Sequence, residues 1–113
     1  MPAFSQPASL AQTINAMRPK FVAQTAERLD RFEVLRDRLE TEGSQTAILD
    51  ELRIGAHKMS GLAAMLGWPD LGDLAGKVEV AIEKAAGGGV QPDQSCLIEV
   101  LDDLLGEMAY IVG

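Results

Sequence analysis

The sequence predicts an all-α fold: an antiparallel up-down-up-down four-helix bundle with a short extra helix at the N-terminus. Apolar residues recur every three or four positions along most of the chain, which is the period of an amphipathic helix. Glycine and proline divide the chain into blocks with short connections, and short connections make successive helices antiparallel neighbours. Aromatic residues make up only 4% of the chain, whereas β-sandwiches depend on aromatic and β-branched residues.

The first two helical blocks meet at a proline. Residues 9–17 are expected to form the short extra helix, with Ser9 as its cap. Pro19 suits the first position of the next helix, where its missing N–H costs nothing. The apolar stripe of that helix consists of Phe21, Thr25, Leu29, Phe32, Leu35 and Leu39. Gly43 ends it at the position where a left-handed residue is favoured.

Three more helices are predicted after Gly43. Ser44 can cap the first, Pro69 opens the second, and Pro92 and Asp93 start the third, after the glycine triplet 87–89. The apolar stripe of the first consists of Ile48, Leu49, Leu52, Ala56, Met59, Ala63 and Leu66. The stripe of the second consists of Leu71, Leu74, Ala75, Val78, Ile82 and Ala85. The stripe of the third consists of Leu97, Ile98, Leu101, Leu104, Leu105 and Met108.

Composition limits the class of protein. A length of 113 residues suits one domain, so 1–113 is interpreted as a single four-helix domain with 1–8 as a loose tail. The net charge of −7 argues against a nucleic-acid partner, which requires clustered Lys and Arg. No apolar run reaches the ~18 residues of a membrane span, and residues 1–8 lack the pattern of a secretion signal. We therefore expect a cytoplasmic protein, in which the single Cys96 is a partly buried apolar residue.

His57 is the only histidine, and helical geometry predicts that its ring is exposed. Successive helical side chains are offset by about 100°, which places His57 roughly 140° from the centre of the apolar stripe. Gly61 follows one turn later and costs the helix about 1 kcal/mol relative to alanine. We interpret Gly61 as giving a partner protein steric access to the imidazole.

An exposed, solitary histidine favours the transfer of a phosphoryl group. Neutral imidazole is a competent nucleophile near neutral pH, because the reference pKa of histidine is about 6.5. Lys58 and Ser60 flank His57, and Arg53 precedes it by one turn, so they are candidates to steady phosphoryl oxygens. A metal site is not expected, because the chain has no second histidine and no cysteine pair. Nothing in the sequence suggests a Ser-His-Asp triad.

The segment 56–69, AHKMSGLAAMLGWP, resembles the active helix of histidine phosphotransfer (HPt) domains. These commonly read A-H-x-x-K-G-x-x-x-x-x-G, followed by a second amphipathic helix, and the resemblance continues through residues 71–84. It implies a four-helix bundle that takes a phosphoryl group from a receiver-domain aspartate and passes it to another receiver. It also implies a phosphocarrier with phosphotransferase character, without kinase activity or a cofactor of its own, because the receiver supplies Mg²⁺.

The resemblance assigns roles to particular residues. By this comparison His57 is the phosphoacceptor, and Glu79 hydrogen-bonds the imidazole. The family usually has lysine three residues after the histidine, where this chain has Ser60, so Ser60 is expected to contact the phosphoryl group. Lys58 points about 160° away from Ser60 on the helix, so Lys58 and Arg53 are assigned only electrostatic support.

The implied partners are response-regulator receiver domains and a hybrid histidine kinase. The candidate docking residues are Ile54, Ala64, Met65 and Trp68, around His57. Met65 and Trp68 have an alternative structural role, with Trp68 covering one end of the bundle. A monomer is expected, because no helix carries a second apolar stripe.

Two other functions fit the same sequence less well. The first is a non-catalytic helical adaptor that binds receiver domains without being phosphorylated, and Ser60 in place of lysine favours it. The second is the dimerisation and phosphoacceptor module of a histidine kinase. That module requires a histidine followed by an acidic residue, whereas Lys58 follows His57 here.

Overall fold

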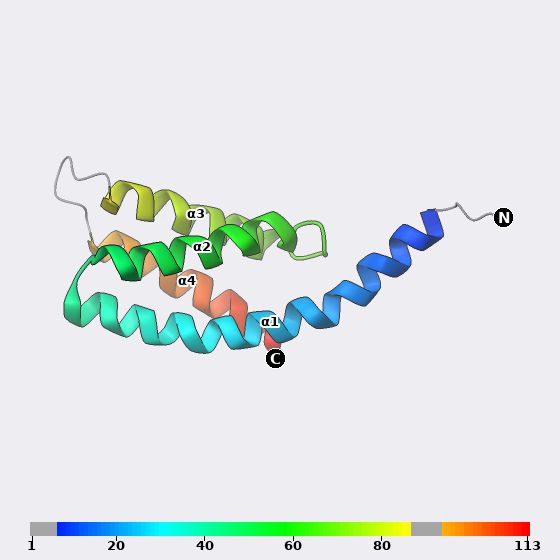
Figure 1. Cartoon of the computed structure of the whole chain (residues 1–113), viewed down its shortest axis with the longest axis horizontal. Helices are drawn as coiled ribbons and strands as arrows, with labels where there is room; N and C mark the ends of the chain where they lie inside the picture. Colours follow the sequence, from blue (N-terminus) through cyan, green and yellow to red (C-terminus); the bar gives the residue numbers. More distant parts are fainter. Residues whose placement is uncertain (1–6, 87–93) are drawn as a thin grey trace.

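Four α-helices make up the fold in the computed structural model, which describes residues 7–86 and 94–113 (Figure 1). They are α1 (Pro7–Glu42), α2 (Thr46–Ala63), α3 (Pro69–Ala86) and α4 (Gln94–Val112). Consecutive helices run in opposite directions, and α4 packs against both α3 and α1. The predicted all-α, antiparallel four-helix bundle is therefore confirmed.

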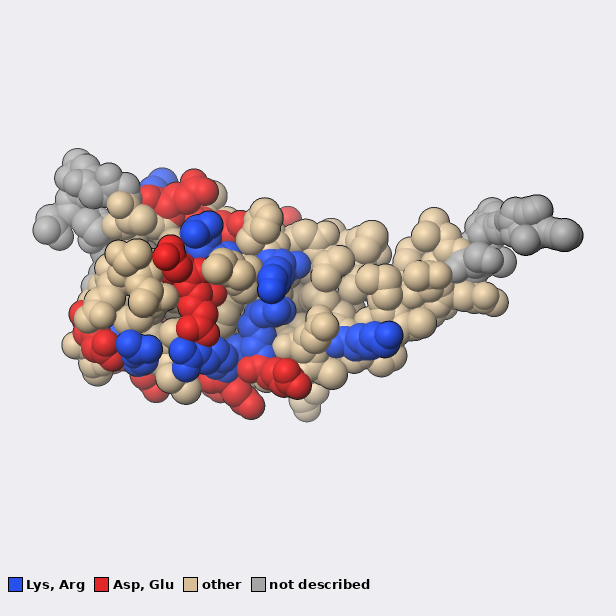
Figure 2. Space-filling model, viewed as in Figure 1, with Lys and Arg blue, Asp and Glu red and all other residues tan. Residues whose placement is uncertain are grey.

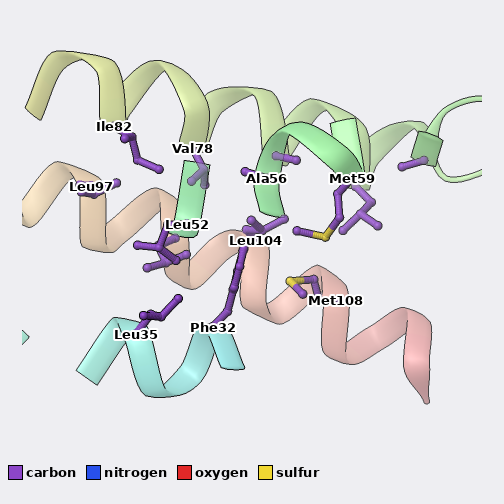
Figure 3. Packing of buried hydrophobic residues seen from close by; sticks show 14 of the residues in the cluster. Phe32, Leu35, Leu52, Ala56, Met59, Val78, Ile82, Leu97, Leu104 and Met108 are labelled. Carbon is purple, nitrogen blue, oxygen red and sulfur yellow. The ribbon is translucent and has the colours of Figure 1, made fainter. Parts of the chain in front are cut away.

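The core is built from the apolar stripes that the sequence predicts. Phe32 from α1, Leu52 from α2 and Leu104 from α4 point into a common interior (Figure 3). Val78 adds the contribution of α3. Burying one such side chain stabilises the fold by roughly 1.5–3 kcal/mol. Because every helix contributes one stripe to this interior, the opposite face of α2 is left for solvent.

The short extra helix is not separate, and this part of the prediction is wrong. Helix α1 continues through Pro19 as one element and begins at Pro7, so Ser9 lies inside the helix and not before its first residue. An interior proline loses one backbone hydrogen bond and tends to bend a helix. Here Pro19 is exposed, so water can hydrate the freed carbonyl group. Figure 1 shows α1 bending along its N-terminal part, which extends beyond the other helices.

A contact beside Pro19 links α1 to the turn that follows α2. The guanidinium of Arg18 donates from Nε to the carbonyl oxygen of Leu66, at 2.8 Å. That carbonyl belongs to the turn between α2 and α3, so Arg18 connects α1 to the end of α2. Of the tail expected at 1–8, residues 7 and 8 are helical, and 1–6 lie outside the described residues.

Glycine and proline end and start the helices largely as predicted. Gly43 has a φ of +85°, which confirms the left-handed position after α1, and Pro69 begins α3. The N-cap of α2 is Gln45, and the Ser44 hydroxyl has no hydrogen-bond partner among the described residues, so the predicted Ser44 cap is wrong. The N–H of Gln45 donates to the carbonyl oxygen of Gly43 at 2.9 Å, and this turn delays the helix start by one residue. Residues 87–93, which include the glycine triplet, Pro92 and Asp93, lie outside the described residues.

The first turn of α4 corrects the expectation for Cys96. Its side chain is exposed, whereas the next residue, Leu97, is buried. Neighbouring helical side chains point about 100° apart, so the inward position of Leu97 turns Cys96 outward. Within the described ranges, no helix is long and apolar enough to cross a membrane.

Candidate functional site

His57 stands on the outer surface of α2, where the sequence places it. Its side chain is 77% exposed, while Ala56 and Met59 on the same helix are fully buried. The rotation of about 100° per residue explains this, because the buried stripe of α2 fixes the direction in which His57 points. The ring can therefore be approached from solvent.

Glu79 on α3 fixes the tautomer of this ring. Its Oε1 lies 2.7 Å from His57 Nδ1, and its side chain is only 22% exposed. An ionised carboxylate can only accept hydrogen bonds, so Nδ1 carries the proton of the neutral imidazole. The lone pair of the ring is then on Nε2, the nitrogen that Glu79 leaves free. The hydrogen bond expected between Glu79 and His57 is present.

Ser60 contacts the other oxygen of the same carboxylate. Its Oγ lies 3.0 Å from Glu79 Oε2 and 3.0 Å from the carbonyl oxygen of His57. A hydroxyl has one hydrogen to donate, so these two acceptors share it. Both carboxylate oxygens of Glu79 are thus engaged from α2, one by His57 and one by Ser60. The hydroxyl expected to contact a phosphoryl group is turned towards Glu79 instead.

Glycines lie near the triad formed by His57, Ser60 and Glu79, where they add no side chains to the surface. A Cβ atom added at Gly61 or Gly76 would meet nothing within 4 Å. A Cβ at Gly72 would lie 3.6 Å from backbone atoms of Ser60 and Ala64, which is an ordinary van der Waals contact. Packing inside the chain therefore requires none of these three glycines.

The two candidate cations do not join the triad. Arg53 contacts Asp50, with its guanidinium nitrogen 3.4 Å from the carboxylate, beside a groove between α2 and α3. Lys58 lines a different groove, between α1 and α2. Neither residue forms a hydrogen bond or ion pair with His57, Ser60 or Glu79. The structure therefore brings His57, Ser60 and Glu79 together and leaves the two candidate cations apart from them.

The candidate docking residues divide into two kinds. Ile54 and Met65 are 51% and 53% exposed, and Ala64 is exposed as well. Trp68 is half-buried and stacks on Phe21, with ring centroids 5.5 Å apart and an interplanar angle of 17°. The alternative structural role therefore fits Trp68. Ile54 remains open on α2 near His57, and Met65 remains open in the turn that follows α2.

Sequence reasoning missed the bond between Ser60 and Glu79. The sequence feature that could have indicated this bond is the position of Ser60, because a hydroxyl one turn after His57 lies on the same side of α2. Among the residues that the structure describes, no group of three or more His, Cys, Asp or Glu side chains is placed to hold a metal ion.

Comparison with known families gives one match. The family model described as "Hpt domain" matches residues 16–109, which is most of the chain. No curated protein and no solved structure matched the chain in the corresponding searches. The match covers all of α2 and α3, and with them His57, Ser60 and Glu79.

Proposed function

The chain belongs to the Hpt domain family, whose members act in histidine phosphotransfer within phosphorelays, and we propose that His57 is the residue that carries the phosphoryl group. In this proposal the chain accepts it from the aspartate of one receiver domain and passes it to another. The observation that carries the proposal is the free Nε2 of an exposed ring whose Nδ1 is held by Glu79.

The transfer step follows from the tautomer. The lone pair of His57 Nε2 attacks the phosphorus of an aspartyl phosphate, and the P–O bond to that aspartate breaks and leaves a carboxylate. The proton stays on Nδ1, where Glu79 accepts its hydrogen bond and offsets the positive charge that the ring gains. Passing the group to a second aspartate reverses the step. The receiver domain, in this proposal, supplies Mg²⁺.

Ser60 acts through Glu79 in this scheme. Its hydroxyl binds Oε2, so the carboxylate cannot easily turn away from the ring when Nε2 attacks. In this proposal the serine positions the carboxylate and does not contact the phosphoryl group directly. The chain then places fewer cationic groups at the phosphoryl oxygens than a member of the family with lysine at this position.

The exposed face of α2 is the proposed docking surface for the receiver. Ile54, His57 and Gly61 lie on it at helical spacing, and the exposed Ala64 and Met65 follow the last residue of α2. Protein interfaces typically combine apolar contacts with polar groups around them, and this surface offers both. A hybrid histidine kinase is a further proposed partner, and we propose that the chain works as a cytoplasmic monomer.

Labelling tests this function directly. Receiver domains from the source organism, each phosphorylated on its aspartate with labelled phosphate, are incubated with the chain and with the variants His57→Ala and Glu83→Gln. Label should appear on the wild type and on Glu83→Gln, which changes an exposed α3 carboxylate that forms no hydrogen bond with His57, Ser60 or Glu79. The label should be acid-labile and base-stable, as for phosphohistidine. Label that persists in His57→Ala overturns the assignment.

A non-catalytic adaptor is the second candidate function. The observation that favours it is Ser60, whose hydroxyl is occupied by Glu79 and which replaces the usual lysine. An adaptor would bind receiver domains with micromolar or tighter affinity and take no label from any of them. Calorimetric titration of each receiver, run beside the labelling assay, separates the two functions.

A further inference from the structure

A groove runs between α1 and α2 beside the proposed docking surface. It has a volume of about 460 Å³, and its walls include Arg28 and Phe32 from α1 and Ile54 and Lys58 from α2. Gly55 lies at its floor, where an added Cβ would be 2.6 Å from the Phe32 ring and 3.3 Å from Arg28 Cδ. The absence of a side chain at Gly55 therefore lets α1 approach α2 and lets the stem of Arg28 lie across the gap.

Two cations in this groove have no hydrogen-bond or ion-pair partner among the described residues. Arg31 is paired with Glu51 across it, with Nη2 2.8 Å from Oε1. By contrast, neither Arg28 nor Lys58 forms a hydrogen bond or ion pair with any other described residue. Arg28 is half-buried, and this burial lowers the pKa of its guanidinium. Figure 2 shows Lys and Arg side chains in a band that crosses from α2 to α1.

The charge of the groove differs from that of the whole chain. The chain carries a net charge of −7, but here the cations of Arg28 and Lys58 face a single unpaired carboxylate, that of Glu27. A half-buried guanidinium has already lost part of its hydration. A carboxylate that binds it is therefore stabilised more than one that binds an exposed, fully hydrated lysine. The groove therefore favours an acidic ligand.

The groove is continuous with the face that carries His57. Ile54, His57 and Lys58 follow one another at i, i+3 and i+4, so they share one face of α2. Ile54 and Lys58 also line the groove. A protein that covers His57 and extends towards α1 must therefore cover Arg28 as well.

We propose that Arg28 and Lys58 bind a carboxylate on the receiver domain, next to its phosphorylated aspartate. The inference rests on the proposed function, because it takes the receiver as the partner. A receiver that holds Mg²⁺ does so with carboxylate ligands, so the rim around its aspartate is acidic and complementary to this groove. Arg28 contributes a two-pronged contact, Lys58 a point charge, and Ile54 the apolar contact between them. The groove selects among receivers, and it takes no part in the chemistry at Nε2.

Paired binding and transfer measurements test the proposal. Arg28→Gln and Lys58→Gln remove one charge each and keep most of the side-chain stem. Lys84→Gln is the matched control, since Lys84 lines the groove between α3 and α4 and also has no ion-pair partner among the described residues. The probe is the receiver domain that labels the wild type fastest, or binds it most tightly if none labels it. Circular dichroism and thermal unfolding establish that each variant is folded.

We expect the variants to bind the receiver more weakly and to transfer the phosphoryl group at a nearly unchanged maximal rate. Arg28→Gln should raise the Kd and the KM for the receiver about tenfold, and Lys58→Gln about threefold, each with kcat nearly unchanged. Both should flatten the dependence of Kd on salt concentration, because they remove a charge from the interface. Labelling by phosphoramidate, a small donor that needs no groove, should proceed at the wild-type rate in all variants.

Two other results would separate a failure of the proposed groove contact from a failure of the proposed phosphoryl transfer. An unchanged Kd in Arg28→Gln, or an equal rise in Lys84→Gln, overturns the groove while His57 can still be labelled. Receiver binding that depends on Arg28 but never yields label on His57 overturns the proposed transfer and keeps the groove as a binding site.

Discussion

His57 and Glu79 face each other across α2 and α3, with Nδ1 of the ring 2.7 Å from Oε1 of the carboxylate. The ring is exposed and the carboxylate is mostly covered, at 77% and 22% exposure. The imidazole of His57 is therefore open to another protein, whereas the carboxylate of Glu79 is held in place by residues of this chain. Any change to Glu79 should act on His57 without touching the docking surface.

Glu79→Ala should slow phosphorylation of His57 by about 10- to 100-fold. A hydrogen bond to a charged group contributes about 1.5–3 kcal/mol, and that free energy corresponds to this range of rates. Glu79→Gln is the matched control, because its amide oxygen can still accept from Nδ1, and it should lose much less. The ¹⁵N shifts of the ring should reveal more of the Nε2–H tautomer in Glu79→Ala. Equal rates in all three proteins would refute the role of Glu79.

Ser60→Ala should slow transfer about fivefold, because it removes a hydrogen bond of about 1 kcal/mol that the hydroxyl shares between Glu79 and the carbonyl oxygen of His57. Ser60→Thr keeps the hydroxyl and should transfer at nearly the wild-type rate. Because Ser60 acts on Glu79 before any phosphate arrives, the tautomer ratio of unphosphorylated His57 should also shift in Ser60→Ala. If Ser60 instead contacts the phosphoryl group, Ser60→Ala would shorten the lifetime of phosphohistidine and leave the tautomer ratio unchanged.

Periodicity alone predicts where His57 lies, because a buried stripe on α2 fixes the directions of all other residues on that helix. The expectation that Glu79 contacts His57 required the resemblance to a family. The contact between Ser60 and Glu79 depends on how far α3 is rotated towards α2, and no spacing within either helix sets that rotation. The sequence alone therefore directs Ser60 to the phosphoryl group, whereas the structure places its hydroxyl against the carboxylate of Glu79.

Two glycines of α2 look alike in the sequence and differ in the structure. Gly55 is buried against the ring of Phe32, whereas Gly61 faces open space. The two glycines differ because Gly55 faces α1, and the sequence of α2 does not show where α1 lies. Pro19 is also ambiguous in the sequence, because a proline that suits the first turn of a helix can also lie in its interior where water hydrates the freed carbonyl group. Exposed Cys96 adds that the residue beside a buried leucine takes its direction from the helix, whatever its usual preference.

The ion pair between Arg31 and Glu51 should make stability depend on pH in acid. The hydrogen bond from Arg31 lowers the pKa of Glu51 below its usual range. A carboxylate with a lower pKa in the folded state stabilises the fold above its unfolded pKa, about 4.3, and loses that contribution as the pH falls through the folded pKa. The difference in Tm between wild type and Glu51→Gln should therefore be greatest near neutral pH and shrink below about pH 4.

A double-mutant cycle with Arg31→Gln isolates this pair from other titrating groups. Because both side chains are largely exposed, the coupling should also weaken in high salt. A coupling that stays constant between neutral pH and about pH 2 would contradict the ion pair.

Gly55→Ala should destabilise the fold by roughly 1–3 kcal/mol, the usual cost of overpacking a core. The new methyl group would meet the Phe32 ring at 2.6 Å, and Phe32 is only 2% exposed, so its ring has little room to move. Gly106→Ala is the control, because a Cβ there meets nothing within 4 Å, and it should stabilise α4 by up to about 1 kcal/mol. Urea unfolding measures both changes, and a Gly55→Ala protein as stable as Gly106→Ala would show that α1 and α2 are not in close contact.

Gly61→Leu should block transfer from a receiver and at the same time stabilise the fold. The site is exposed and open, so leucine fits without a clash, and its better helix propensity adds up to about 1 kcal/mol. The new side chain stands one turn from His57 on the docking face, and displacing the reacting atoms by about 1 Å can cost about 100-fold in rate. Gly106→Leu makes the same chemical change on α4, where it should stabilise the protein and leave transfer unchanged. Phosphoramidate should still label Gly61→Leu, because a small donor passes the leucine. Normal transfer from the receiver to Gly61→Leu, measured beside this control, would mean that the partner does not approach His57 over Gly61.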